Sequence, residues 1–228
     1  MKTQDTNIEK MLAAGAHFGY SKTRRHPSAS PYIIGTKNRT DLFDLSKTSE
    51  SLDKAKKFVA DLAKEGKTVL FVGVKPEARE ATKNAALSID MPYALDRWIG
   101  GTLTNFPEIK RRTQKLEDLR EKKAKGELDM YTKKERLGID QDIEKLSRYF
   151  AGLVSLKKMP EAIVIVDIKK EHIAVAEAKM MGIPVIGIAN TDCNLKEVEY
   201  AIPANDSSRG SIDFIVSSLA GAYTAGKN

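Results

Sequence analysis

Three short runs of apolar, largely β-branched residues stand out along the chain, at positions 68–74 (TVLFVGV), 162–168 (AIVIVDI) and 184–188 (PVIGI). Uninterrupted apolar runs of this length are typical of strands that are buried on both faces of a parallel sheet. Segments with helix-like spacing begin after them, at Pro76 and Glu171, and a last helix is expected from Ser207 or Ser208. The repeated order of strand and helix predicts a parallel α/β domain.

The hydrophobic pattern before position 66 predicts two further elements. Residues 32–34 and 41–45 flank a polar tip at 35–39, which indicates a hairpin or an extended pair with an exposed basic tip. From 46 to 65 the apolar residues fall on one helical face, so a helix is expected there. Asn194, with Glu197 three residues later, has the spacing of a capping box and predicts another helix start.

The segment 106–156 differs in kind, because Lys, Arg, Glu and Leu dominate and apolar residues recur three or four apart. Helices are predicted over 107–125 and 132–156, with Thr132 and Glu135 forming a capping box at the second start. Leu116 and Leu119 are expected to face four residues of the return helix, namely Leu137, Ile143, Leu146 and Phe150. The prediction is an antiparallel helical hairpin, resembling a coiled coil, inserted into a globular domain formed by 1–105 and 157–228.

Charged residues are unevenly distributed along the chain. The 228 residues carry 38 Lys and Arg against 31 Asp and Glu, a formal net charge of +7. Residues 1–47 hold +4 and 106–159 hold +5, whereas 160–228 hold −3, so one basic and one acidic side are expected. Such polarity favours an anionic partner for the basic side, and nucleic acid is the commonest one.

Composition also excludes several classes of protein. A single cysteine, Cys193, rules out a disulfide framework and a zinc finger, and indicates a reducing cytoplasm. The polar start and the lack of a long apolar run predict neither secretion nor a membrane partner.

Motifs for catalysis or cofactor binding are missing. Neither G-x-G-x-x-G nor the P-loop pattern follows a predicted strand, and His17, His26 and His172 lie in no nucleophile motif. The spacing leaves open a metal site made by His17, Cys193 and Asp192 or Asp206, but a lone histidine is more often structural. Asp167 ends a strand, where capping of the next helix is favoured over catalysis. No catalytic residue, metal ligand, cofactor or small-molecule substrate is therefore assigned.

Basic clusters in the two most positive segments are the remaining candidates for chemistry. Cations on loops and helix starts, helped by Asn and Thr, are suited to phosphate contacts, although each cluster alone could be a solvated surface. For Trp98, packing in the core is an equally good alternative. The predicted RNA-binding residues are Lys22, Arg24, Arg25, Lys37, Asn38, Arg39, Arg97, Trp98, Thr104, Asn105, Lys110, Arg111, Arg112, Lys133 and Lys134.

Residues 97–106 (RWIGGTLTNF) resemble the signature of the S-two family of small-subunit ribosomal proteins. The segments 14–19 (AGAHFG), 41–48, 132–135, 183–193 and 202–206 (IPAND) resemble further family motifs in the same order. The chain departs from the family pattern at Tyr20, where a histidine is frequent, at Asn194 and Leu195, and at Ala204, which replaces a glycine.

The resemblance implies a flavodoxin-like α/β domain with an inserted helical hairpin. It also implies a structural, non-enzymatic protein that binds small-subunit rRNA between the head and body of the subunit and supports translation and assembly. Neighbouring ribosomal proteins are implied as partners, including the messenger-binding protein S-one in bacteria that contain it.

Two other functions remain open from the residues alone. A doubly wound α/β enzyme would bind a small anionic ligand at the carboxyl edge of the sheet, near Gly73 and Lys75. A free adaptor would use the acidic side to bind protein and would not bind RNA.

Overall fold

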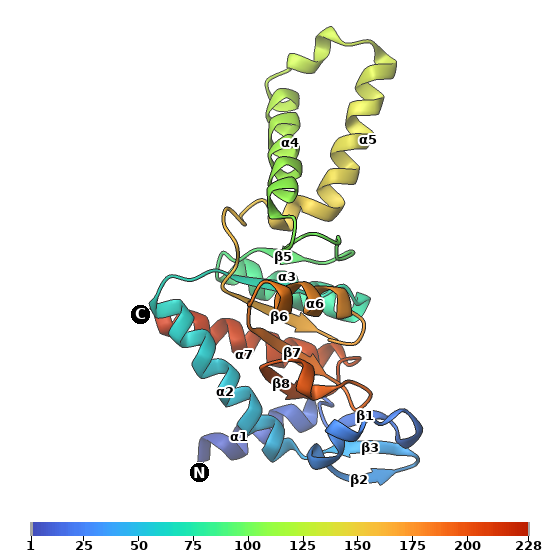
Figure 1. The fold of residues 1–228 in the computed structure, drawn as a ribbon, viewed down its shortest axis with the longest axis vertical. Coiled ribbons are helices and arrows are strands. Elements are labelled where there is room, and N and C mark those ends of the chain that lie inside the picture. Colours follow the sequence, from blue (N-terminus) through green and yellow to red (C-terminus); the bar gives the residue numbers. More distant parts are fainter. Residues whose placement is uncertain (1, 228) are drawn as a thin grey trace.

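The computed structural model describes residues 2–227, with the backbone alone for 2–5 and 129. Its larger sheet has five strands in the order β5-β4-β6-β7-β8, and each neighbouring pair is parallel. The strands are β4 (Val69–Val72), β5 (Tyr93–Ala94), β6 (Ala162–Val166), β7 (Val185–Ala189) and β8 (Tyr200–Pro203). The predicted mixed α/β fold with a parallel sheet is therefore confirmed (Figure 1).

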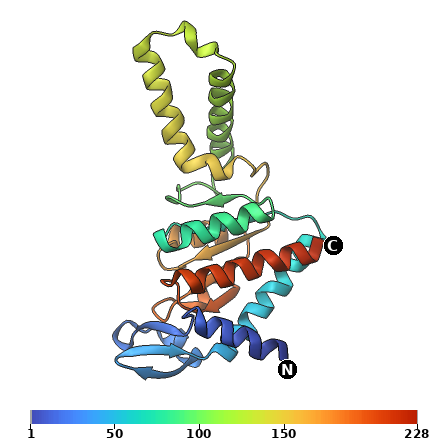
Figure 2. The same cartoon turned by 180° about the vertical axis from the view of Figure 1, so that it is seen from behind.

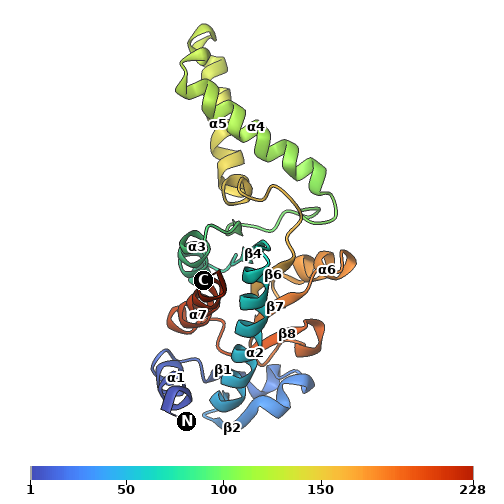
Figure 3. The ribbon, with the colours of Figure 1, turned by 90° about the vertical axis from the view of Figure 1, so that its left-hand side faces the viewer.

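Two apolar cores cover the two faces of this sheet. Along β4, Val69 and Phe71 enter one core while Leu70 and Val72 enter the other, as the alternation of side chains in a strand requires. The first core is shared with α2 (Leu45–Lys64), α3 (Pro76–Ser88) and α7 (Arg209–Lys227). The second is shared with α6 (His172–Met180) on the opposite face (Figure 3). Burial on both faces explains why these strands have continuous apolar sequences.

A small antiparallel sheet, β1-β3-β2, lies at one end of the molecule (Figure 1). It contains β1 (Phe18–Ser21), β2 (Ile33–Lys37) and β3 (Thr40–Phe43), with the 3-10 turns η1 (Lys22–Arg24) and η2 (Pro27–Tyr32) between β1 and β2. The predicted hairpin is confirmed, and its turn places both Asn38 and Arg39 at positive φ, 50° and 65°. Two such residues form the tight turn that matches the twist of a hairpin.

Two long helices, α4 (Phe106–Ala124) and α5 (Lys133–Phe150), extend from the opposite end of the molecule, next to β5 of the large sheet (Figures 1 and 2). The short turn η3 (Glu127–Met130) lies between them, and Thr132 and Glu135 form the predicted capping box. Leu116, near the middle of α4, is fully buried, but Leu137 is 59% exposed, so the predicted place of Leu137 between the helices is wrong. The predicted second helix was also too long, because η4 (Ala151–Leu153) replaces its final turns.

Apart from the 3-10 turns, four elements are not predicted by the hydrophobic pattern. They are α1 (Lys2–Ala13), the strand β1, the two-residue strand β5 and the edge strand β8. The expected helix after Asn194 is only the short turn η5 (Leu195–Glu197), although Asn194 does accept a hydrogen bond from the Lys196 amide. No helix within residues 2–227 combines the length and the apolar content needed to cross a bilayer.

Candidate nucleic-acid interface

The loop before α4 is held by one buried carboxylate on α6. Glu177 Oε1 accepts hydrogen bonds from Trp98 Nε1 (3.1 Å) and from the Gly101 amide (2.8 Å). Its Oε2 accepts from the Leu103 amide (3.0 Å) and from the amide and hydroxyl of Thr104 (both 3.2 Å). Because α6 packs against the sheet, these five bonds tie the root of the two long helices to the globular domain.

These donors also decide the charge state of the carboxylate. Burial alone would raise the pKa of Glu177, but the backbone amides of Leu103, Gly101 and Thr104 and the Trp98 indole lower that pKa overall. Hydrogen bonds to the charged form favour ionisation. Glu177 is therefore an anion at neutral pH, although only 6% of its surface is exposed.

The same contacts correct one predicted RNA contact. The Trp98 side chain is 6% exposed and belongs to the second core, so core packing applies to it and its indole is not available to stack on RNA. Thr104 and Asn105 remain exposed at the end of the loop. Asn105 is the N-cap residue of α4, yet its side chain makes no capping hydrogen bond.

A cleft of about 680 Å³ opens beside this loop, between the root of α4 and the end of α5. Arg111, Arg112, Lys115 and Lys145 line it together with Asn105. Arg111 and Arg112 share one partner, Glu108, at 3.7 and 3.2 Å, so the pair keeps an excess of positive charge. The structure thus brings three predicted residues, Asn105, Arg111 and Arg112, into one basic cleft.

A second basic group lies on the small sheet, at the opposite end of the molecule (Figure 1). The Lys22 amide donates to the Arg39 carbonyl (3.1 Å), and both residues line a hollow of about 860 Å³ with Thr36. The guanidinium of Arg24 lies 5.7 Å from the centre of the Tyr20 ring. Lys37 and Asn38 are exposed at the adjoining turn. Among the described residues, no carboxylate forms an ion pair with any of these four cations.

Arg25 has a structural role within this group. Its Nε and Nη2 atoms donate to the two oxygens of Asp41, at 2.7 and 2.5 Å, and Asp41 is fully buried. The hydrogen bond from Arg25 is the main reason that the pKa of Asp41 is lowered. A bidentate pair of this kind already offsets the charge of the guanidinium, so Arg25 is less suited to a phosphate contact than the unpaired cations around it and is left out of the proposed contacts.

The other predicted cations are exposed at scattered places. Arg97 precedes the buried Trp98, and Lys110 lies on α4 outside the residues that line the cleft. Lys133 and Lys134 begin α5 at the far end of the two long helices. The predicted residues therefore do not form a single patch, because the small sheet and the start of α5 lie at opposite ends of the molecule (Figure 2).

The carboxyl edge of the large sheet holds a buried charge cluster. Lys75 Nζ lies 2.6 Å from Asp167 and 2.9 Å from Asp206, and its side chain is 11% exposed. Burial would lower the pKa of Lys75, but the two carboxylates raise it overall. Because its charge is neutralised inside the protein, Lys75 cannot serve a small anionic ligand, which argues against the enzyme alternative. Asp167 also accepts from the Lys170 amide (3.0 Å), but this bond lies in the turn before α6. The N-cap residue of α6 is Glu171, whose side chain makes no capping bond, so the prediction that Asp167 caps the next helix is wrong.

Three possible metal ligands meet at the same edge. One ligand atom each from Asp167, Cys193 and Asp206 lies within 4.8 Å of the others, and His17 is not part of this group. The Lys75 ammonium already supplies the positive charge between the two carboxylates. We therefore assign no metal there.

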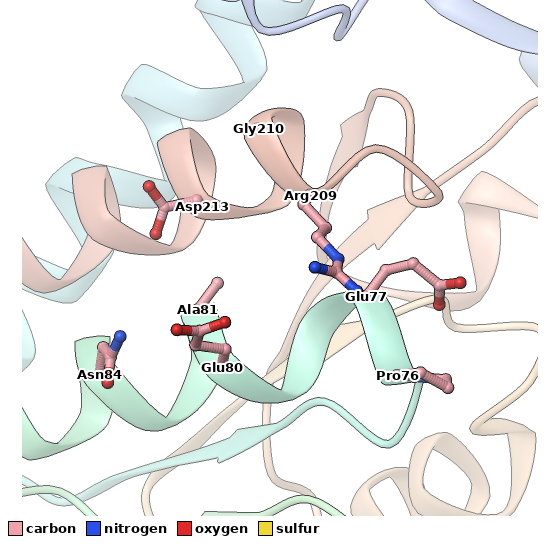
Figure 4. A pocket seen from close by; sticks show the side chains of 8 residues that line it. All are labelled: Pro76, Glu77, Glu80, Ala81, Asn84, Arg209, Gly210 and Asp213. Atoms are coloured by element: carbon pink, nitrogen blue, oxygen red, sulfur yellow. The ribbon is translucent and has the colours of Figure 1, made fainter.

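A further hollow of about 390 Å³ separates the first turns of α3 and α7 (Figure 4). Glu77, Glu80 and Asp213 line it against a single cation, Arg209. Phosphate is repelled by such an excess of carboxylate, so this surface is not a candidate for RNA.

The sequence was compared with protein families and with curated proteins. The model of the family described as ribosomal protein S2 matches residues 11–226. The chain belongs to the ribosomal protein S2 family. It is 39% identical to the small ribosomal subunit protein uS2 of Parabacteroides distasonis, over 96% of this chain and 79% of that protein. It is 40% identical to the uS2 of Sulfurimonas denitrificans, over 96% of this chain and 85% of that protein. The identification suggested by the sequence motifs is confirmed.

The loop that carries the S2 family signature has a structural role in this chain. Arg97, Trp98, Thr104 and Asn105 of this segment are predicted to bind RNA, whereas the structure shows that much of the loop binds Glu177. Glu177 was missed, although it falls on the same helical face as the buried residues Ala174 and Ala178. A carboxylate on an apolar helix face is rarely left unpaired, and this was the available signal.

Proposed function

We propose that the chain is a structural component of the small ribosomal subunit that binds small-subunit rRNA and supports translation and subunit assembly. The match to the ribosomal protein S2 family along nearly the whole chain supports the ribosomal role, which is not enzymatic, and with it the cytoplasmic location. Neighbouring small-subunit proteins are the expected protein partners.

The basic cleft at the root of α4 is the observation that carries the RNA-binding part of the proposal. Exposed cations on the two long helices converge there beside the loop that ends at Asn105, whereas the carboxyl edge of the sheet is internally neutralised. Phosphate oxygens are bound by solvent-facing Arg and Lys side chains of this kind. The proposed contact residues are Lys22, Arg24, Lys37, Asn38, Arg39, Arg97, Thr104, Asn105, Lys110, Arg111, Arg112, Lys133 and Lys134.

The finer arrangement follows from the family resemblance. The fold is read as flavodoxin-like, with residues 1–105 and 157–228 forming the α/β domain and 106–156 forming an inserted hairpin resembling a coiled coil. The ion pair of Lys123 with Asp140 (2.6 Å) and the bond from Arg120 to Ser147 (2.9 Å) join the two helices and support that reading. In the subunit the protein lies between head and body, with its acidic C-terminal part toward proteins, S-one among them where it is present.

Charge reversal at Arg111 and Arg112 tests the RNA-binding proposal. The variant Arg111→Glu/Arg112→Glu should compete poorly with wild type for incorporation into small subunits assembled in cells, while its unfolding transition stays close to wild type. The matched control, Lys54→Glu/Lys83→Glu, makes the same charge change on the exposed surfaces of α2 and α3. Normal incorporation of the arginine variant, or equal loss in the control, would contradict the assignment of the cleft.

The salt dependence of RNA binding gives an independent readout. Each lost phosphate contact lowers the slope of log affinity against log salt by about one for duplex RNA, on the scale known from DNA. The arginine variant should therefore bind small-subunit rRNA with a slope smaller by about one to two. An unchanged slope would show that these guanidiniums do not contact phosphate.

A further inference from the structure

The basic cleft has an apolar floor beneath its charged rim. Ile99, Leu146 and Tyr149 line it, each half-buried against the second core with part of its surface turned to solvent. Phosphate contacts alone would not need such a floor, because a phosphodiester backbone is bound by charge and hydrogen bonds. The cleft therefore has the character of a site for a flat apolar body joined to an anion.

The charge and the volume of the cleft limit the kinds of ligand that it can bind. Among the residues that line the cleft, four cations face two carboxylates, Glu108 and Asp142. Glu108 is shared by Arg111 and Arg112, and Asp142 lies 3.6 Å from Lys115, while no ion pair involves Lys145 within the described part of the chain. A volume of about 680 Å³ is in the range of pockets that take small organic groups.

Asn105 supplies a polar group of the kind that recognises a base edge. It lines the cleft at the first turn of α4, and its amide is not used to cap that helix. An Asn amide donates and accepts side by side, which is complementary to adenine. Proteins that bind unpaired RNA combine an apolar or aromatic stacking surface, cations and such base-edge contacts.

From these observations we propose that the cleft takes one unpaired nucleotide of the RNA, with adenine favoured. The base lies on the floor formed by Ile99, Leu146 and Tyr149, its edge meets the Asn105 amide, and the flanking phosphates meet Arg111, Arg112 and Lys115. The inference rests on the proposed RNA-binding function and deepens it: part of the contact would be read through an extruded base rather than through the backbone alone.

Gly100 offers a way to fill the cleft without disturbing the fold. It lines the cleft, its φ lies outside the positive range, and a Cβ built there meets no atom within 4 Å. Gly138 on α5 is equally open and lies outside the cleft, so Gly138→Leu is the matched control for Gly100→Leu. Both variants add the same side chain at a glycine with free space.

Binding of the full-length protein to three short RNA duplexes tests the proposal. One duplex is perfect, one has a single bulged adenosine, and one has a bulged abasic residue. Wild type and Gly138→Leu should bind the bulged adenosine about tenfold more tightly than either other duplex, because stacking of one base contributes this much. Gly100→Leu should lose that preference and keep the affinity for the perfect duplex. A fourth duplex with a bulged uridine tests the base edge: Asn105→Ala should reduce the preference for bulged adenosine over bulged uridine.

The outcomes separate this inference from the function on which it rests. If wild type binds all three duplexes equally, no base enters the cleft, and an acidic protein segment becomes the better occupant. If wild type binds none of the duplexes, nor isolated small-subunit rRNA, the RNA-binding proposal itself fails. A third outcome concerns the source of the nucleotide. If millimolar adenosine monophosphate displaces the bulged duplex and the bulged and perfect duplexes bind equally well, the cleft binds a free nucleotide, which would contradict the proposal that it binds a nucleotide of the RNA.

Discussion

Removal of the Glu177 carboxylate should be among the most damaging single changes in this protein. Glu177→Ala deletes the acceptor of five hydrogen bonds and leaves three backbone amides, one indole N–H and one hydroxyl without it. A hydrogen bond to a charged acceptor contributes about 1.5–3 kcal/mol, but bonds to one group are not additive. Single substitutions rarely exceed about 5 kcal/mol, so we expect a loss of about 3–5 kcal/mol in the free energy of unfolding.

Glu177→Gln separates the charge from the shape. The Gln amide keeps one acceptor oxygen, but its NH2 group replaces the second carboxylate oxygen and faces N–H donors that had bonded to that oxygen. We therefore expect the free energy of unfolding to fall by about 1–3 kcal/mol. Urea unfolding followed by circular dichroism at pH 7 measures both variants. Glu80→Ala, at an exposed carboxylate of α3, is the control and should change the free energy by less than about 0.5 kcal/mol.

The pH dependence of the free energy of unfolding of the same variants tests the contribution of the Glu177 charge. The pKa of Glu177 is lower in the folded state than in the unfolded chain, where a Glu titrates near 4.3. The folded state is therefore stabilised by this group above that value, and the contribution is lost as pH falls through the folded pKa. The difference in the free energy of unfolding between wild type and Glu177→Gln should therefore decrease as the pH falls from about 5 to about 3. A Glu177→Ala loss below about 1 kcal/mol at pH 7, or a constant difference with pH, would refute the reasoning.

Three further predictions concern packing, reactivity and capping. A Cβ at Gly152 would overlap the Tyr93 carbonyl, so Gly152→Ala should destabilise by about 1–3 kcal/mol, whereas Gly138→Ala, in open space on α5, should stabilise by about 0.5–1 kcal/mol in the same urea titration. Burial raises the pKa of the Cys193 thiol, so iodoacetamide at pH 8 should alkylate it only when urea unfolds the protein; rapid alkylation of the native protein would contradict its burial. Thr132→Ala should cost about 1 kcal/mol and speed amide exchange in the first turn of α5, and unchanged exchange there would rule out the cap.

The sheet was predictable from sequence where both faces of a strand are buried. Ala162–Val166 has no polar residue, because alternate side chains enter two different cores, and this leaves a clear apolar run. By contrast, Tyr200–Pro203 is an edge strand that packs less symmetrically, and Tyr93–Ala94 is too short to give a pattern. Periodicity reports burial, so elements that are short or at an edge are not visible in it.

The candidate interface was predictable in its residue types but not in its geometry. Local clusters identified Arg111 and Arg112, and these residues line the cleft. Lys145 was not found, because it reaches the cleft from the other long helix, and only tertiary packing brings the two together. The same limit applies to Trp98 and Arg25, whose buried partners are Glu177, 79 residues away, and Asp41 on a neighbouring strand.

Sedimentation of the full-length, tagged protein in sucrose gradients of cell lysate tests the central claim most directly. The proposed role predicts a peak with the small ribosomal subunit at low salt that decreases as salt is raised, because cations bound to phosphate are displaced by counterions. The Arg111→Glu/Arg112→Glu variant should leave the peak at lower salt than wild type. Protein that remains at the top of the gradient at every salt concentration would contradict the ribosomal role.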